Sequence, residues 1–162
     1  MRTSVSKLDA ILTAVAVRLR DQLSLDAATC YLALDPDSIP NPNPGTFFVV
    51  VSPTSGSFDE ANFAGGGVSQ ATLQTSVIVR VYSPVQLDEP HHDTQWLTST
   101  TVGIVEQMRR VLKALAGHDL ESSGAQILAQ PIFPQSQTFG RYSRALGYGE
   151  LVFGIVFDWD LS

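Results

Sequence analysis

The stretch that begins at Leu73 constrains the fold of this chain more than any other. From Leu73 to Tyr82, apolar and polar side chains alternate, which is typical of a half-buried β-strand. Ser83-Pro84 ends the strand because proline has no N–H to donate to a sheet, and the acidic turn Asp88-Glu89-Pro90 follows. A long amphipathic helix pattern then extends to about Leu115. A strand that leads into a helix, with no catalytic motif nearby, favours a scaffold or assembly protein over an enzyme.

The alternation gives this predicted strand two unlike faces. One face is apolar enough to lie in a core. The other is mixed, so it contacts either solvent or another subunit. The core face carries Leu73, Thr75, Val77, Val79 and Val81, and the mixed face carries Gln74, Ser76, Ile78, Arg80 and Tyr82.

Two helices are predicted, each from an apolar stripe with helical spacing. The first extends from about Ser4 to Leu23, and the second from near Pro90 to Leu115, with Gly117 as its C-terminal cap. The first stripe consists of Leu8, Ile11, Leu12, Val15, Leu19 and Leu23. The second consists of Leu97, Thr101, Ile104, Val105, Met108, Val111, Leu112 and Leu115.

Further strands are predicted at 30–34, 46–52, 124–130 and 150–159, and the apolar alternation of the last one indicates an interior strand. Residues 35–45 hold four prolines and predict an exposed loop. Residues 53–69 form either a mobile loop or a hairpin arm with a flexible tip, and residues 131–149 a long loop or irregular arm. This order predicts an α+β fold, a mostly antiparallel sheet with two main helices packed on one side.

Size and composition limit the class of protein. A chain of 162 residues predicts one domain, residues 1–162. Charged residues make up 16% of it, below the usual quarter, so part of the surface is either buried against other copies or solubilised by Ser, Thr and Gln. The net charge of −6 disfavours a protein that coats nucleic acid, although DNA can pass such a surface without binding.

The single cysteine and the hydropathy pattern indicate the cellular compartment in which the protein is expected. Cys30 excludes an intrachain disulfide, and its apolar surroundings predict a buried, inert thiol. No stretch is long and apolar enough to predict a membrane span. The N-terminal pattern does not fit a signal peptide, so we expect assembly in a cytoplasm.

Candidates for chemistry are few. His91-His92-Asp93 contains metal-binding residue types but lacks a completing HxxxH or HxxE pattern, so a polar first helical turn is favoured. Gly65-Gly66-Gly67 lacks the lysine and spacing of a phosphate-binding loop. Asp158 and Asp160 share a strand face and are expected to be solvated rather than an acid–base pair. We therefore predict no catalytic, cofactor-binding or metal-binding residues.

An aromatic and arginine cluster precedes the last strand. It contains Phe133, Phe139, Arg141, Tyr142, Arg144 and Tyr148. Such residues are enriched at protein interfaces, but aromatic side chains of a loop also fold back onto a core. Together with the mixed strand face, the cluster predicts a subunit or partner interface formed by Phe139, Arg141, Tyr142, Arg144, Arg80 and Tyr82.

The chain resembles the tail terminator proteins of long-tailed bacteriophages and, more loosely, the proteins that cap contractile tubes. The resemblance lies in the helix at 7–23, the strand at 75–82 ended by Ser83-Pro84, the helix at 102–112, and the segment 142–148 before the last strand. It covers nearly the whole chain and rests on the order of elements, without a signature motif.

This resemblance implies a small α+β protein of the virion tail or neck, without enzymatic activity or cofactor, assembled in the host cytoplasm. It implies a six-membered homo-oligomeric ring that closes the tail tube. Its partners would be the tail tube protein and a head-completion or connector protein. Two alternatives stay open: another neck or minor tail protein, and a small enzyme with a dispersed site around His91, His92 and the terminal acids.

Overall fold

The structure is a computed structural model that describes residues 7–39, 47–54, 56–64, 67–85, 96–99, 103–122 and 125–160. Its helices are α1 (Lys7–Leu23) and α3 (Ile104–Leu115). Its strands are β1 (Cys30–Leu32), β2 (Phe48–Pro53), β3 (Ser57–Ala64), β4 (Gly67–Pro84), β5 (Glu121–Ser122), β6 (Ala125–Gln126), β7 (Phe133–Arg141) and β8 (Leu146–Asp160).

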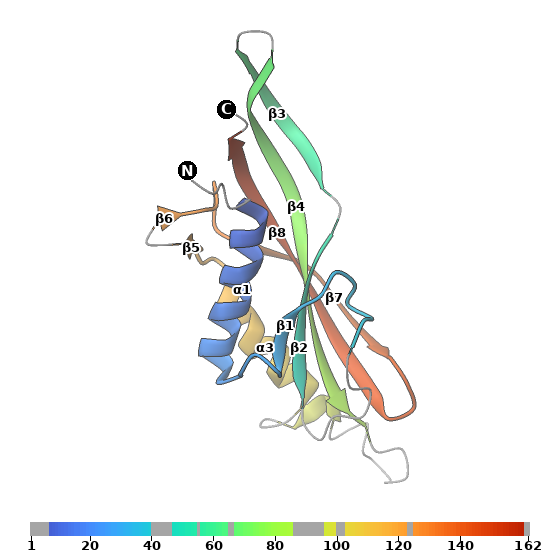
Figure 1. Cartoon of the computed structure of the whole chain (residues 1–162). Helices are drawn as coiled ribbons and strands as arrows, with labels where there is room; N and C mark the ends of the chain where they lie inside the picture. Colours follow the sequence, from blue (N-terminus) through green and yellow to red (C-terminus); the bar gives the residue numbers. More distant parts are fainter. Residues whose placement is uncertain are drawn as a thin grey trace.

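One twisted sheet with strand order β1-β2-β4-β8-β7 forms the body of the molecule (Figure 1). Every pairing in it is antiparallel except that of β1 with β2, which is parallel. The predicted α+β fold with a mostly antiparallel sheet is therefore confirmed. The last strand is interior, as predicted, because β8 lies between β4 and β7.

Both helices cover the same face of the sheet, which confirms the predicted layering (Figure 1). The main core lies between the helices and this face. It includes the predicted core face of β4 and the apolar stripe of α1. Its fully buried members include Ile11, Val15, Leu19, Val77, Val79, Val81, Val111, Phe153, Ile155 and Phe157.

The second helix is shorter than the sequence predicts. Residues 96–98 form a separate helical turn, Ser99 and Gly103 are not helical, and α3 begins at Ile104. The chain bends back closely here, since a Cβ on Gly103 would lie 2.4 Å from the carbonyl oxygen of Ser99. At the other end, Gly117 follows the last turn with a φ of 76°, which suits glycine. Residues 90–95 and 100–102 of the predicted helix lie outside the described residues.

The prediction of a loop at 131–149 is wrong, because most of this segment is β7 and the start of β8. As an edge strand, β7 has no buried side chain on either face, so its sequence lacks apolar alternation. The predicted strand at 124–130 is also largely wrong. Among its described residues, only Ala125–Gln126 form a strand, β6, which pairs with β5, and Ala129 donates its N–H to Val156 O at 2.8 Å.

The described residues of 53–69 adopt the hairpin arm, one of the two predicted alternatives, while Gly65 and Gly66 of its predicted tip lie outside the described residues. β3 pairs with the first half of β4, and the hairpin projects beyond the helices (Figure 1). Two register shifts interrupt the pairing, between Phe58 and Glu60 and between Asn62 and Phe63. In the described part of the chain, no helix is long and apolar enough to cross a membrane.

Candidate interaction site

The face of the sheet opposite the helices carries a small second core. Residues 33–39, here called the strap, continue from β1 and contribute Ala33 and Ile39 to it. Its buried members are Phe48, Val50, Tyr82 and Leu146. The rings of Phe48 and Tyr82 stack with centroids 4.9 Å apart.

Arg80 joins the strap to the sheet. Its Nε and Nη2 donate to Glu150 Oε2 at 2.8 and 2.5 Å, and Glu150 lies directly opposite on β8. Its Nη1 donates to Asp37 of the strap and, at 3.0 Å, to the hydroxyl of Tyr82. The guanidinium also lies 4.2 Å from the ring centroid of Tyr148. Arg80 is 8% exposed, and each of its three guanidinium nitrogens donates a hydrogen bond. A buried charge needs such partners to offset the loss of hydration.

The ionisation of this cluster is fixed by its surroundings. Burial raises the pKa of Tyr82 to about 12, although hydrogen bonding to Arg80 acts in the opposite direction. The neutral phenol donates to the carbonyl oxygen of Pro36 in the strap. Burial alone would lower the pKa of Arg80, but its hydrogen bonds to Tyr82, Glu150 and Asp37 outweigh burial and raise it. Arg80 therefore stays charged and holds the strap in place.

The other predicted interface residues lie in β7 or in the turn that follows it. Tyr142 is 39% exposed, and its ring meets that of Tyr82 edge-on at 5.8 Å. Arg141 donates to the carbonyl oxygen of Arg144 at 3.3 Å, and both arginines are exposed. Phe139 is 41% exposed and pairs with Gly149, which places it on the helix side of the sheet.

The structure thus divides the six predicted residues into three groups. Arg80, Tyr82 and Tyr142 meet on the strap side, Arg141 and Arg144 at the turn, and Phe139 on the opposite face. Their role at an interface stays a prediction. Sequence reasoning missed Asp37 and Glu150, the two carboxylates that pair with Arg80. Only the β4–β8 register, which brings Glu150 opposite Arg80, would have identified the second pair.

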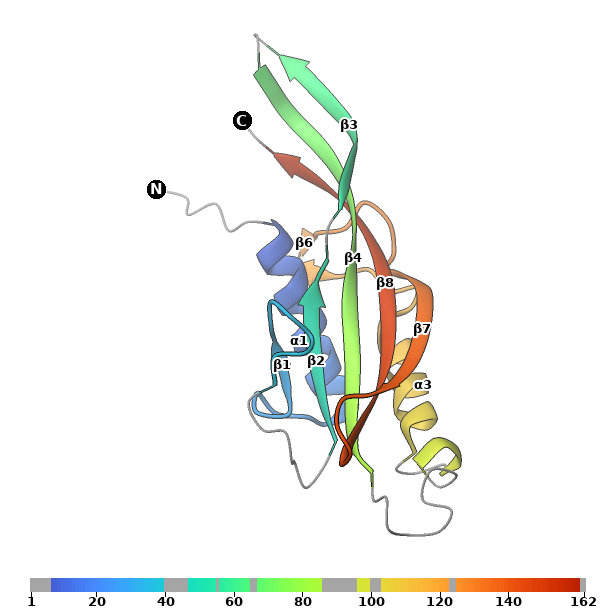
Figure 2. The same cartoon turned by 90° about the vertical axis from the view of Figure 1, so that its right-hand side faces the viewer.

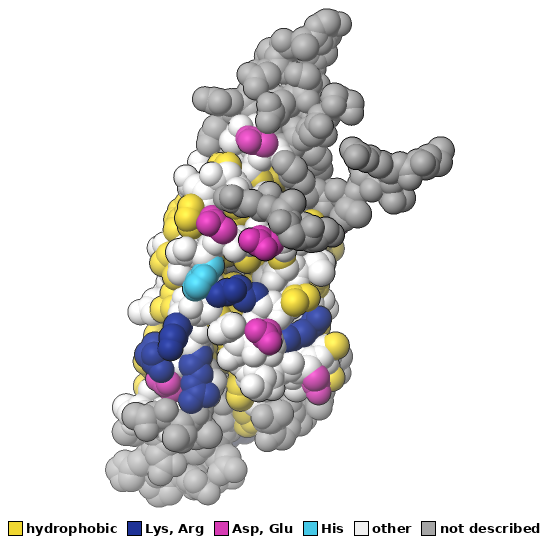
Figure 3. All heavy atoms as spheres, turned by 90° about the vertical axis from the view of Figure 1, so that its left-hand side faces the viewer, with side chains coloured by type: hydrophobic (Ala, Val, Ile, Leu, Met, Phe, Trp, Pro, Cys, Tyr) yellow, Lys and Arg dark blue, Asp and Glu magenta, His cyan; other side chains and the backbone are white. Residues whose placement is uncertain are grey.

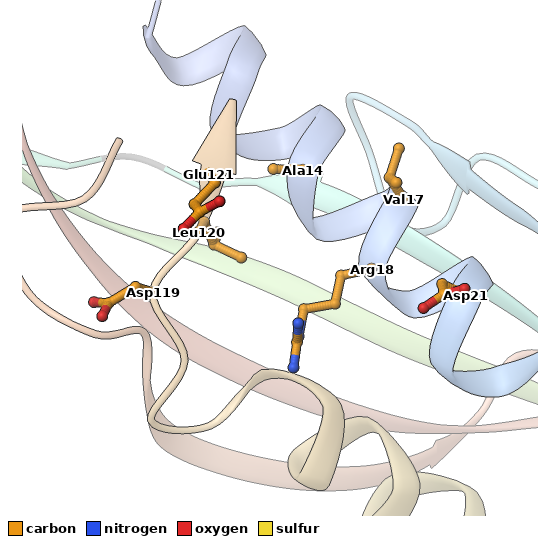
Figure 4. A pocket seen from close by; sticks show the side chains of 7 residues that line it. All are labelled: Ala14, Val17, Arg18, Asp21, Asp119, Leu120 and Glu121. Atoms are coloured by element: carbon orange, nitrogen blue, oxygen red, sulfur yellow. The ribbon is translucent and has the colours of Figure 1, made fainter. Parts of the chain in front are cut away.

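A cleft of about 530 Å³ lies between α1 and residues 119–121 (Figure 4). Figure 4 shows the side chain of Arg18 pointing from α1 toward the end of α3, where it donates to Ala114 O. Arg18 Nη2 also lies 3.0 Å from His118 Nδ1. The carboxylates of Asp21, Asp119 and Glu121 line the cleft. Because Arg18 is bonded to the end of α3, it ties the two helices together.

The exposed side of α3 is basic. Arg109, Arg110 and Lys113 are exposed there, and cationic side chains gather on this face of the molecule (Figure 3). Glu106 pairs with Arg109 at 2.7 Å and with Arg110 at 3.4 Å. The hydrogen bond from Arg109 is the main reason that the pKa of Glu106 falls to about 2.

The remaining candidates from the sequence are the histidines, the acidic residues and the cysteine. His91, His92 and Asp93 lie outside the described residues. Within the described ranges, no three His, Cys, Asp or Glu side chains are placed to bind a metal ion. Asp158 accepts a hydrogen bond from Thr72 Oγ1 at 2.8 Å. Cys30 is buried, as predicted, and burial raises its pKa to about 11, which disfavours the reactive thiolate.

Comparisons with known proteins find similarity in fold and none in sequence families. No protein-family profile matches the sequence, and no curated protein does. A chain of the virion of a native gene transfer agent particle superposes with a TM-score of 0.54 at 16% identity, over 96% of this chain and 99% of that one. Another solved structure superposes with a TM-score of 0.50 at 17% identity, over 93% and 94% of the two chains. The fold of this chain thus occurs in a virion protein.

Proposed function

We propose that the chain is a structural virion protein, a tail terminator. Six copies form a ring that caps the tail tube and contributes to the head–tail interface. The likeness to a gene transfer agent virion protein over nearly the full length of both chains carries this proposal. The resemblance in the order of the elements points the same way.

The geometry of the described residues suits a protein that works by docking. Arg80, its most buried charged residue, is paired with Glu150 and with Asp37 of the strap. The thiol of Cys30 is buried. The β3–β4 arm projects from the body, where it can reach a neighbouring protein (Figure 2). The partners in this proposal are other copies, the tail tube protein and a head-completion or connector protein. DNA passes through the ring without specific contacts, which fits a net charge of −6.

Electron microscopy of particles made without this protein tests the proposal. A tail terminator stops tube growth, so its loss should give abnormally long tails that do not join heads. Complete tails of normal length that fail to join heads would contradict the terminator role and identify a connector. Normal, infectious particles would contradict any structural role in the tail.

A further inference from the structure

We infer that copies of this chain join edge to edge, with β1 of one copy pairing antiparallel with β7 of the next. This inference rests on the proposed ring and names the surfaces that close it. β1 and β7 are the two edges of the body sheet and lie on opposite sides of the molecule (Figure 2). A contact between two different surfaces is heterologous and can close into a ring.

The two edges lie at the same level of the sheet. Following the register across it, Leu32 pairs with Val51, Val51 with Val79, Val79 with Leu151, and Leu151 with Gln137. A neighbouring copy therefore needs no large shift along the strands to bring its β7 beside β1. Such a contact can repeat around an axis that runs roughly along the strands.

The strand directions also match. β1 runs parallel to β2, and each later step across the sheet reverses direction, so β7 runs opposite to β1. When the next copy has the same orientation, its β7 meets β1 as an antiparallel neighbour. The junction then continues the pattern of the sheet within each copy.

Both edges direct backbone groups outward. On β1, Thr29 O accepts from Val49 N–H, and Ala33 N–H donates to Val51 O. Because backbone groups alternate along a strand, the N–H and C=O of Tyr31 also point toward β2, and those of Leu32 point away from it. On β7, Tyr142 donates to Leu146 O, and the alternation from this bond turns the N–H and C=O of Gln137 and Phe139 away from β8. On β1 the N–H of Cys30 already donates to Asp26 O and its carbonyl oxygen accepts from Arg20, so Leu32 offers the outward backbone groups of this strand. Outward backbone groups at a sheet edge are a template for pairing with another chain.

The side chains at the two edges fit each other. Leu32 is 43% exposed, Leu34 is 89% exposed and Phe139 is 41% exposed. By register, Leu32 and Phe139 both lie on the helix side of the sheet. Pairing at the same level sets Leu32 opposite Gln137 and diagonal to Phe139, within contact range for large side chains. The centre of β7, residues 136–140, carries no lysine, arginine or proline that would guard an edge.

Charge adds to the match at one end of the junction. Asp26 precedes β1 and is exposed, while Arg141 and Arg144 follow the centre of β7 and are exposed. Because Cys30 and Phe139 stand at the same level, these acidic and basic groups lie at the same end of the two edges. In the ring, Asp26 of one copy faces the arginines of the next.

Cysteine cross-linking of the full chain tests the junction. Leu32→Cys with Gln137→Cys, oxidised mildly, should give a ladder of linked species up to the closed ring, since paired Cα atoms lie within disulfide reach. Each single variant, and Leu32→Cys with Val105→Cys on α3, should stay unlinked. A ring by native mass spectrometry without this ladder would overturn the edge pairing and leave the proposed ring standing. Leu32→Cys dimers would also overturn it, because they require a symmetric contact.

A proline substitution gives an independent test. Gln137→Pro removes an outward N–H that β8 does not use, so the monomer should fold while the ring is lost. The matched control Thr138→Pro removes an inward N–H and should destabilise the monomer itself. A Gln137→Pro variant that still forms rings would contradict the inference. A wild-type chain that stays monomeric both alone and on tail tubes would contradict the proposed function as well.

Discussion

At the scale of single residues, Arg80 carries a positive charge with 10% of its side chain exposed, beneath the strap. Replacing it by Met leaves Glu150, whose side chain is 17% exposed, without its cation. Removal of one partner of a buried ion pair typically costs about 3–5 kcal/mol. We expect Arg80→Met to lower the free energy of unfolding by about 3 kcal/mol in urea denaturation.

Two further variants separate the effect of the lost ion pair on stability from the effect of lost packing. Arg80→Met combined with Glu150→Gln should lose less stability than the sum of the single variants, because neutral Gln needs no cation. Arg110→Met, at an exposed ion pair on α3, should have a much smaller effect. Equal losses for Arg80→Met and Arg110→Met would contradict the role assigned to the buried pair.

Tyr82 makes stability sensitive to alkali. Its pKa of about 12 lies above the ordinary value of 10.0, so the folded state holds the phenolic proton more tightly than the unfolded state. This contribution to stability is fully present below pH 10 and is lost as pH rises toward 12. Tyr82→Phe should cost about 1–2 kcal/mol at pH 8, because the hydroxyl's hydrogen bonds are lost. Between pH 10 and 12, the stability of the variant should then decline less steeply than that of the wild type.

Urea unfolding at pH 8 and at several pH values above 10 measures both effects. Equal slopes for wild type and Tyr82→Phe in the alkaline range would show that the phenol of Tyr82 is not protected by burial.

At the scale of elements, glycines let neighbours approach the sheet closely. A Cβ on Gly149 would lie 2.3 Å from Met108 Sδ of α3, and a Cβ on Gly154 would lie 2.3 Å from the ring of Phe133 on β7. We expect Gly154→Ala to cost about 1–3 kcal/mol through overpacking. Phe133→Leu in the same chain should recover part of this loss, which a double-mutant cycle measures. Simple additivity would mean that the ring of Phe133 does not lie on Gly154.

The β3–β4 arm can be separated from the body by deletion. Replacing residues 59–72 with Asn-Gly joins Phe58 and Leu73, which are paired in the hairpin, through a two-residue turn. Because the main core extends over α1, α3 and the body sheet, the shortened chain should keep a cooperative thermal transition. In the proposed function it should no longer stop tail growth. Loss of folding would show that the arm is part of the body's stability.

Sequence patterns predicted the elements whose two faces differ. β4 alternates between the core and the strap side, α1 has one apolar stripe, and β8 is buried in the interior, so each carries a periodic signal. β7 could not be predicted because an exposed edge strand has no apolar period, and its pairing with β8 comes from tertiary structure. The break before α3 was missed because Ile104 and Met108 continue the helical spacing of Leu97 and Thr101 across Gly103.

At the scale of the whole molecule, the candidate site depended on register that sequence alone does not supply. Arg80 and Tyr82 were predicted from one strand, whereas Asp37 comes from the strap and Glu150 from β8. The same register places β1 and β7 at one level on opposite edges. In the inferred ring, these two edges join neighbouring copies.

Native mass spectrometry of the wild-type chain, alone and after incubation with tail tubes, tests the central claim most directly. The claim is that this protein acts by closing a ring of identical copies. It predicts one closed species with the mass of six chains, free in solution or bound at tube ends. A chain that stays monomeric at high concentration and does not bind tail tubes would contradict it.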